Sequence, residues 1–187
     1  MHILVTGANG FMGRNLCAAL GNLRPQDKLW RVDVDTPQQR LSQAAMQADF
    51  VFHLAGVNRP QDPAEFMRGN HDAAASLLQM LERGKKPPVL LTSSTQAALE
   101  NPYGQSKRAG EEAVRAYGER TGAPVYVYRL TNAFGKWSRP HYNSAVATFC
   151  YNIARGLPIQ VNDPDAVLRL NYIDDILSLI HISEPTR

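Results

Sequence analysis

The sequence has only two cysteines, no long apolar run and no cluster of like charges. Cys17 and Cys150 lie far apart without metal-like spacing, so we expect a reduced protein with no disulfide framework and no metal site. No stretch approaches the roughly 18 consecutive apolar residues of a membrane span, and the strand-like start leaves no room for a signal peptide. The net charge of +3 is scattered, whereas a nucleic-acid binder carries a basic stripe. We therefore expect a cytoplasmic protein with no membrane and no nucleic-acid partner.

Short apolar segments alternate with helix-like segments, which is typical of a parallel α/β sheet. Expected strands cover residues 3–6, 28–32, 50–54, 89–91 and 125–130, and expected helices cover residues 11–20, 37–47, 63–83 and 102–121. Thr36 is expected to open a capping box, Asn101 to cap the last of these helices, and Gly122 to end it. Beyond Asn132 the pattern becomes irregular, as substrate-binding loops do.

A glycine-rich turn joins the first expected strand to the first helix. Gly7, Gly10 and Gly13 allow a tight turn and a close approach of the backbone to a pyrophosphate, and the helix N-terminus offers free N–H groups. Asp33 follows Gly13 by about 20 residues, at the end of the second strand, as in dinucleotide-binding folds. We therefore expect a Rossmann-like doubly wound parallel sheet that binds NAD(P). The turn residues expected at the cofactor are Gly7, Asn9, Gly10, Phe11, Met12 and Gly13.

The choice between the two cofactors stays open at this point. Asp33 suits the ribose hydroxyls of NAD, whereas Arg14 and Arg31 suit the 2′-phosphate of NADP or are simply solvated. Further cofactor contacts are expected from the small residues that end the third strand and from the next helix: Leu54, Ala55, Gly56 and Asn70. For Asn70, a structural role is as well supported as a cofactor contact. For His53, a structural role is favoured.

Tyr103 and Lys107 lie four residues apart at the start of a helix, so they share one face. A nearby ammonium is expected to lower the phenol pKa, and Lys107 can also hold the nicotinamide ribose. Tyr103 is then the expected general acid for a ketone that receives a hydride. The hydroxyl cluster just before it supplies a hydrogen bond to the ketone; Ser94 is our choice, with Ser93 and Thr92 as reserves. Ser94, Tyr103 and Lys107 form the predicted catalytic group.

These features together resemble the extended short-chain dehydrogenases/reductases, the NAD-dependent epimerase/dehydratase family, and within it the reductases of capsular polysaccharide synthesis. The likeness covers residues 1–176. Only one helix fits between Asp35 and Asp49, so the strand that standard extended members place there is expected to be absent. The stretches that carry the resemblance are residues 52–60, 101–107, 132–137, 142–144, 147–154, 159–164 and 171–175.

The resemblance implies NADPH-dependent reduction of the 4-keto group of a UDP-2-acetamido-2,6-dideoxy-hexos-4-ulose, on the route to UDP-N-acetyl-L-fucosamine. NADH stays possible, because Val34 stands where a basic residue would support NADP. The loop after the last expected strand implies substrate contacts from Asn132, Arg139 and Asn143. The resemblance also implies a homodimer and a C-terminal metal-binding cupin domain, of which this sequence contains nothing.

Three rival functions fit the sequence less well. A 4,6-dehydratase needs an acid–base pair beside the active hydroxyl, but Thr95 and Gln96 follow Ser94. An epimerase-reductase of the GDP-fucose type needs a cysteine just after the serines, and none is there. A non-catalytic cofactor sensor tends to lose the tyrosine or the lysine, and both are kept.

The last eleven residues resemble the translation of a transposase adapter used in sequencing libraries. We therefore expect an NAD(P)-binding domain at residues 1–135, the start of a substrate-binding region at 136–176, and a non-native scar at 177–187 that packs poorly. The doubly wound sheet is then truncated before its substrate-binding region is complete, and we expect the chain to be inactive alone.

Overall fold

The computed structural model describes residues 1–182, and residues 183–187 lie outside the described residues. The chain divides into two compact units, which we call the first unit, Met1–Arg129, and the second unit, Leu130–Arg187. The division falls shortly before residue 135, the expected end of the NAD(P)-binding domain. That residues 1–135 bind the cofactor stays a prediction. Among the described residues, no helix combines the length and the apolarity that crossing a bilayer requires.

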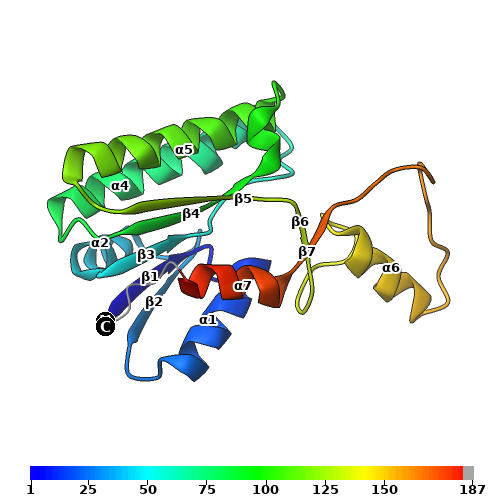
Figure 1. Ribbon diagram of the computed structural model, residues 1–187, viewed down its shortest axis with the longest axis horizontal. Helices are drawn as coiled ribbons and strands as arrows, with labels where there is room; N and C mark the ends of the chain where they lie inside the picture. Colours follow the sequence, from blue (N-terminus) through cyan, green and yellow to red (C-terminus); the bar gives the residue numbers. More distant parts are fainter. Residues whose placement is uncertain (183–187) are drawn as a thin grey trace. The chain divides into compact units, whose positions relative to one another are not determined.

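The first unit is built on a five-stranded sheet with the order β2-β1-β3-β4-β5 (Figure 1). The pairs of β1 with β2, β1 with β3, and β3 with β4 are all parallel. The expected doubly wound parallel sheet is therefore confirmed. The strands are β1 (His2–Thr6), β2 (Lys28–Val32), β3 (Phe50–His53), β4 (Val89–Ser94) and β5 (Val125–Leu130), the last of which ends at the first residue of the second unit.

Helices cover both faces of this sheet, α4 and α5 on one side and α1 on the other (Figure 1). The sequence missed a π-helical segment that interrupts the expected helix 63–83, and a short 3-10 turn after β4. The helices of the first unit are α1 (Phe11–Leu23), α2 (Gln38–Gln47), α3 (Ala64–Met67), the π-helix η1 (Arg68–Asp72), α4 (Ala73–Arg83), the 3-10 helix η2 (Thr95–Ala98) and α5 (Pro102–Thr121).

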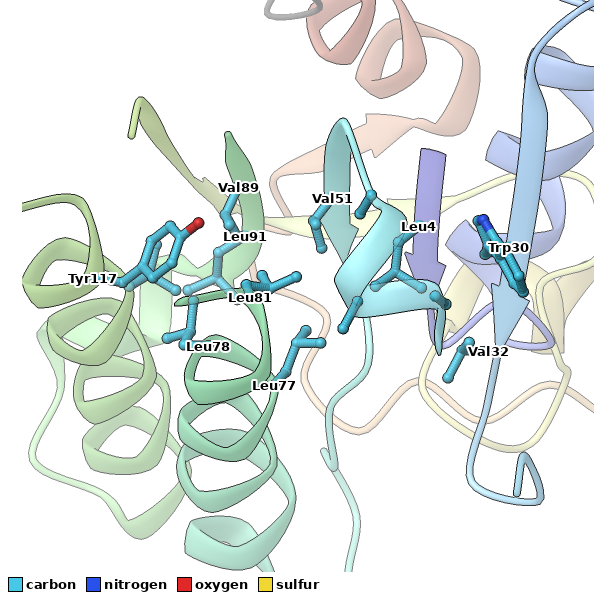
Figure 2. Close-up of a cluster of buried hydrophobic side chains, with 14 residues drawn as sticks. Leu4, Trp30, Val32, Val51, Leu77, Leu78, Leu81, Val89, Leu91 and Tyr117 are labelled. Atoms are coloured by element: carbon cyan, nitrogen blue, oxygen red, sulfur yellow. The ribbon is translucent and has the colours of Figure 1, made fainter. Parts of the chain in front are cut away.

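The strands of the sheet are apolar on both faces because helices cover both. Ile3 and Val5 of β1 are as fully buried as Leu4, which lies between them. Figure 2 shows the cluster on the α4–α5 side, where Leu81 of α4 and Tyr117 of α5 lie against the strand residues. The members of this cluster are Leu4, Trp30, Val32, Ala44, Ala45, Ala48, Val51, Leu77, Leu78, Leu81, Val89, Leu91, Val114 and Tyr117.

The helix ends test the local sequence predictions. The Asn101 side chain accepts a hydrogen bond from the Gly104 N–H at 2.7 Å, and Gly122 ends α5 with a left-handed φ of 73°, both as expected. The capping box at Thr36 is wrong: Pro37 is the N-cap of α2, and the Thr36 hydroxyl instead accepts the Asp33 N–H at 2.8 Å. The hydroxyl stabilises the turn after β2, where Asp33 lies.

The sheet ends at β2, and α2 alone connects β2 to β3. In the described residues no further strand pairs with the outer side of β2. This agrees with the expectation that the unit between Asp35 and Asp49 omits a strand. Asp33 therefore lies at an edge of the sheet.

The second unit contains a two-stranded parallel sheet of β6 (Asn132–Phe134) and β7 (Leu170–Tyr172). Helix α6 (Ala145–Ile153) precedes β7, and Ser144 caps it by accepting the Ala147 N–H at 3.2 Å. Helix α7 (Ile173–Ile182) runs across the expected start of the scar at 177. Leu177 is only 8% exposed, so the expectation that the tail packs poorly is wrong for this residue. The foreign origin of the tail stays a prediction.

Candidate cofactor and active site

The glycine-rich turn has the geometry that a dinucleotide phosphate requires. Gly7 has a φ of +67°, and a β-carbon there would lie 2.8 Å from the backbone nitrogen of Ala55. Gly10 caps α1 in an extended conformation with no side-chain cap, and the first turn of α1 has no acidic residue. Glycine has no side chain that could cap the N–H groups of that turn, and no carboxylate of the turn itself faces them, which suits an anion.

Gly13 has a different task from Gly10. A β-carbon on Gly13 would overlap the carbonyl oxygen of Gly7, so α1 packs directly on the turn. A β-carbon on Gly10 would meet only that same oxygen, at 3.2 Å. Gly13 therefore sets the packing of helix on turn, whereas Gly10, which is exposed, borders the space where a phosphate would lie.

Asp33 is tied to the glycine-rich turn. Its Oδ2 accepts the Asn9 N–H at 2.7 Å, and its Oδ1 accepts the Val34 N–H at 2.8 Å. The structure thus brings Asp33 to the turn, and its expected role at the cofactor ribose stays a prediction. Val34 is 99% exposed, and the side chains of Arg14 and Arg31 are also at the surface.

The segment after β3 is held by Asn70, which lies in the π-helix. Asn70 accepts the Val57 N–H at 2.9 Å, donates to the Val57 carbonyl at 2.8 Å, and donates to the Ser106 hydroxyl at 2.9 Å. A β-carbon on Gly56 would lie 2.8 Å from Asn70 Oδ1 and 3.6 Å from Lys107 Nζ. Gly56, Asn70 and Lys107, all predicted cofactor residues, therefore lie together.

His53 is buried at the carboxyl end of β3. Its Nδ1 lies 2.7 Å from the Thr6 hydroxyl, on the neighbouring strand. Burial lowers the pKa of His53 to about 4, and the positive charge of Lys107 adds to this effect. The ring is therefore neutral at physiological pH, which agrees with the structural role favoured from the sequence.

Tyr103 meets Ser94, the last residue of β4. The Ser94 hydroxyl is close enough to the Tyr103 phenol to act on its pKa. Burial raises the pKa of Tyr103, and the nearby Ser94 hydroxyl opposes this only in part. The expectation that a neighbouring ammonium lowers the phenol pKa is wrong for this structure, because desolvation dominates. The raised pKa keeps the phenol protonated, as a proton donor must be.

Lys107 lies one turn further along the same face of α5. Its Nζ donates to the Thr92 carbonyl at 2.8 Å, and the residue is 8% exposed. Burial lowers the pKa of Lys107 to about 8, and the Glu111 carboxylate opposes this shift. Tyr103 and Lys107 thus meet the same end of β4 on consecutive turns of α5.

Comparison with known families identifies this arrangement. Residues 3–183 match the pattern described as the NAD dependent epimerase/dehydratase family. The chain belongs to this family. Membership in a family described as NAD dependent, together with the glycine-rich turn, supports a nicotinamide dinucleotide cofactor.

Several members of the family are similar to the chain. The UDP-2-acetamido-2,6-beta-L-arabino-hexul-4-ose reductase of Pseudomonas aeruginosa is 51% identical over 178 residues, which are 95% of this chain and 48% of the relative. The crystal structure of the capsular polysaccharide assembling protein CapF from Staphylococcus aureus has a TM-score of 0.89 and 47% identity, over 100% of this chain and 52% of that one. The chain therefore spans about half the length of these relatives.

A more distant member shows the fold alone. The UDP-glucuronic acid 4-epimerase from Bacillus cereus, whose structure was solved in complex with NAD, has a TM-score of 0.79 and 23% identity. The match covers 97% of this chain and 74% of the epimerase. The Rossmann-like sheet is thus shared with family members of low sequence identity.

The second unit contains the three residues expected to bind substrate. Asn132, at the start of β6, Arg139 and Asn143 are all exposed. The Arg139 guanidinium lies 5.4 Å from the Tyr142 ring centre, and Trp137 has a left-handed φ of 68°. The role of these residues in substrate binding stays a prediction.

Sequence reasoning missed Glu111, a fully buried carboxylate on α5. It accepts the Ser93 hydroxyl at 2.6 Å and both Nε and a terminal nitrogen of Arg129, at 2.9 and 2.8 Å. The spacing carried a signal, because Glu111 continues the four-residue step from Tyr103 to Lys107. Carboxylates are almost never fully buried unless they are paired, and Glu111 is paired with Arg129.

Proposed function

We propose that the protein reduces the 4-keto group of a UDP-2-acetamido-2,6-dideoxy-hexos-4-ulose, at the expense of NADPH. The observation that carries the proposal is the 51% identity to a UDP-2-acetamido-2,6-beta-L-arabino-hexul-4-ose reductase, which covers 95% of this chain. Tyr103 and Ser94, which lie near each other, and Lys107 supply the groups that ketone reduction needs.

Tyr103 donates the proton in this proposal. A hydride that arrives at the ketone carbon places negative charge on the oxygen, and a protonated phenol within hydrogen-bond reach neutralises it. Burial favours the protonated phenol by raising the Tyr103 pKa. Ser94, which lies near Tyr103, orients the same ketone oxygen with its hydroxyl. Electron flow and proton transfer then balance, and the alcohol is the product.

Lys107 and the glycine-rich turn hold the cofactor. When bound, the cofactor supplies the hydride. The Gly10 end of α1 is proposed to receive the pyrophosphate, and the Lys107 ammonium the nicotinamide ribose, beside Gly56 and Asn70. Leu54 and Ala55 pack against the adenosine side in this proposal, next to Gly7.

NADPH is preferred over NADH in this proposal. Both Asp33 oxygens already accept backbone N–H groups, from Asn9 and Val34, which reduces what the carboxylate can offer to ribose hydroxyls. Arg14 and Arg31 are surface cations beside this end of the sheet, suited to a 2′-phosphate. Titration calorimetry with NADPH and NADH tests the preference; tighter binding of NADH overturns it.

We also propose that the full-length protein is a cytoplasmic homodimer with a C-terminal metal-binding cupin domain. The support is the resemblance to capsular polysaccharide reductases, together with relatives about twice as long as this chain. Mass measurement of the full-length protein in solution tests the dimer.

The deciding experiment incubates the purified full-length protein with NADPH and the UDP-4-keto sugar, and follows the product by NMR. We expect loss of NADPH and a new proton on C4, in equal amounts. Gly10→Val, whose β-carbon faces the phosphate space, is expected to lose cofactor affinity and keep a cooperative melt. NADPH loss without a reduced sugar, or a sugar that changes without NADPH loss, contradicts the proposal.

A further inference from the structure

One face of α5 meets three consecutive residues of β4. Tyr103 lies near Ser94, Lys107 donates to the Thr92 carbonyl at 2.8 Å, and Glu111 accepts the Ser93 hydroxyl at 2.6 Å. The three helix residues follow one another at intervals of four, so each turn of α5 makes one contact with the strand end. The contacts of Tyr103 and Lys107 belong to the proposed active site. The contact of Glu111 with Ser93 involves neither the substrate nor the cofactor in that proposal.

Glu111 is the most heavily bonded carboxylate of this face. Its side chain is 0% exposed, and it accepts the Ser93 hydroxyl and two of the three guanidinium nitrogens of Arg129 from β5, while Arg115 lies 3.4 Å away on α5. These hydrogen bonds and cations lower the pKa of Glu111 against the opposing effect of burial. The carboxylate is therefore ionised while it is buried next to the active lysine.

We propose that Glu111 is a positioning residue of the active site, which orders the end of β4 through Ser93 and supplies the negative charge that balances Lys107. The role of Glu111 in catalysis rests on the proposed function. The electrostatic effect of Glu111 on Lys107 does not depend on that function. Glu111 touches no reacting atom and acts through Ser93 and Lys107.

The charge of Glu111 matters because Lys107 is buried. The groups that face this ammonium are the Thr92 carbonyl from β4, the neutral ring of His53 from β3, and the Glu111 carboxylate from α5. Burial lowers the Lys107 pKa to about 8, and Glu111 is the one cause that raises it. Without that carboxylate, the ammonium would lose its proton at a lower pH and with it the charge offered to the cofactor ribose.

The test measures the Lys107 pKa directly, by the ¹³Cε shift of labelled lysine, with Lys107→Arg to assign the signal. Glu111→Gln keeps the side-chain shape and removes the charge, and is expected to lower the Lys107 pKa by roughly 1 or more. The alkaline limb of the kcat/KM profile is expected to move to lower pH by the same amount. Glu112→Gln, an exposed neighbour on the same helix, is the matched control and leaves both unchanged.

A second variant keeps the proposal testable if Glu111→Gln does not fold. Arg129→Gln removes the partly exposed cation beside Glu111, so the Lys107 pKa is expected to rise. An unchanged Lys107 pKa in the folded Glu111→Gln protein overturns the proposal, as does an unchanged or lower one in Arg129→Gln. The NMR titration needs no substrate, so a wrong assignment of the reaction leaves its result intact.

Discussion

The two units of the chain differ in how they use their apolar residues. In the first unit, strands and helices share one dense core in which Leu4, Phe52 and Leu81 are fully buried. In the second unit, Ile153 is 66% exposed and Val167 is 89% exposed. The first unit also contains every residue that we assign to the chemistry and to the cofactor. Tight packing and precise placement of reacting groups therefore occur in the same part of the molecule, because a packed scaffold holds side chains in fixed positions.

The largest effect is expected at the contact of α1 with the glycine-rich turn. Gly13→Ala places a β-carbon on the Gly7 carbonyl oxygen, which neither backbone can avoid, so we expect a loss of about 4 kcal/mol or more in unfolding free energy. Gly21→Ala, in the same helix with nothing within 4 Å, is the control and should stabilise by about 0.5–1 kcal/mol. Urea unfolding measures both. Equal effects of the two would show that the turn is not closely packed.

The second largest difference between the two units is expected in catalysis. Tyr103→Phe removes the proposed proton donor of the first unit and is expected to lower kcat by roughly 10²–10⁴-fold with the fold intact. Arg139→Ala, in the second unit, is expected to raise KM about tenfold through a lost charged contact and to change kcat little. Steady-state kinetics of the full-length protein give both values. A fall in kcat for Arg139→Ala alone would place chemistry in the second unit and break the comparison.

Matched truncations test the difference in packing itself. Leu81→Ala leaves a cavity under α4 and is expected to cost roughly 2–5 kcal/mol of unfolding free energy. Val167→Ala, at an exposed position, should stay within about 0.5 kcal/mol of the unchanged protein. A large loss at Val167, measured by urea unfolding of the full-length protein, would mean that it is buried there.

The smallest of the four effects is a dependence of the unfolding free energy on pH. The His53 pKa is about 4 in the folded protein, against an ordinary value of 6.5, so between these limits the unfolded chain binds more protons. Stability should therefore fall as the pH drops from about 6.5 to about 4, by about 3 kcal/mol in total. His53→Gln should lose this dependence, while His71→Gln, with a side chain 35% exposed, should keep it. Urea midpoints across this range decide; identical pH slopes in both variants would refute the assignment.

The sequence predicted most of the first unit and little of the second, for a physical reason. Apolar strands buried on both faces, the Asn101 cap and the Gly122 stop leave local patterns that can be read without a structure. The glycine-rich turn, Asp33 and the Tyr103–Lys107 pair are likewise local. The π-helix that contains Asn70 and the Glu111–Arg129 ion pair are not local features, because each depends on elements that meet only after folding. Thr36 failed as a cap because the Asp33 N–H competes for its hydroxyl.

The edge strand β2 has a consequence for self-association. A sheet that stops at β2 presents a row of backbone donors and acceptors on which another copy's strand can add. Lys28 and Arg31 are exposed on this short strand, and Lys28 lies 4.2 Å from the Trp30 ring centre. Two edges brought together would place these like charges side by side, which opposes pairing. Lys28 and Arg31 thus oppose aggregation between copies at the open edge of the sheet. This effect is separate from any contact with a phosphate.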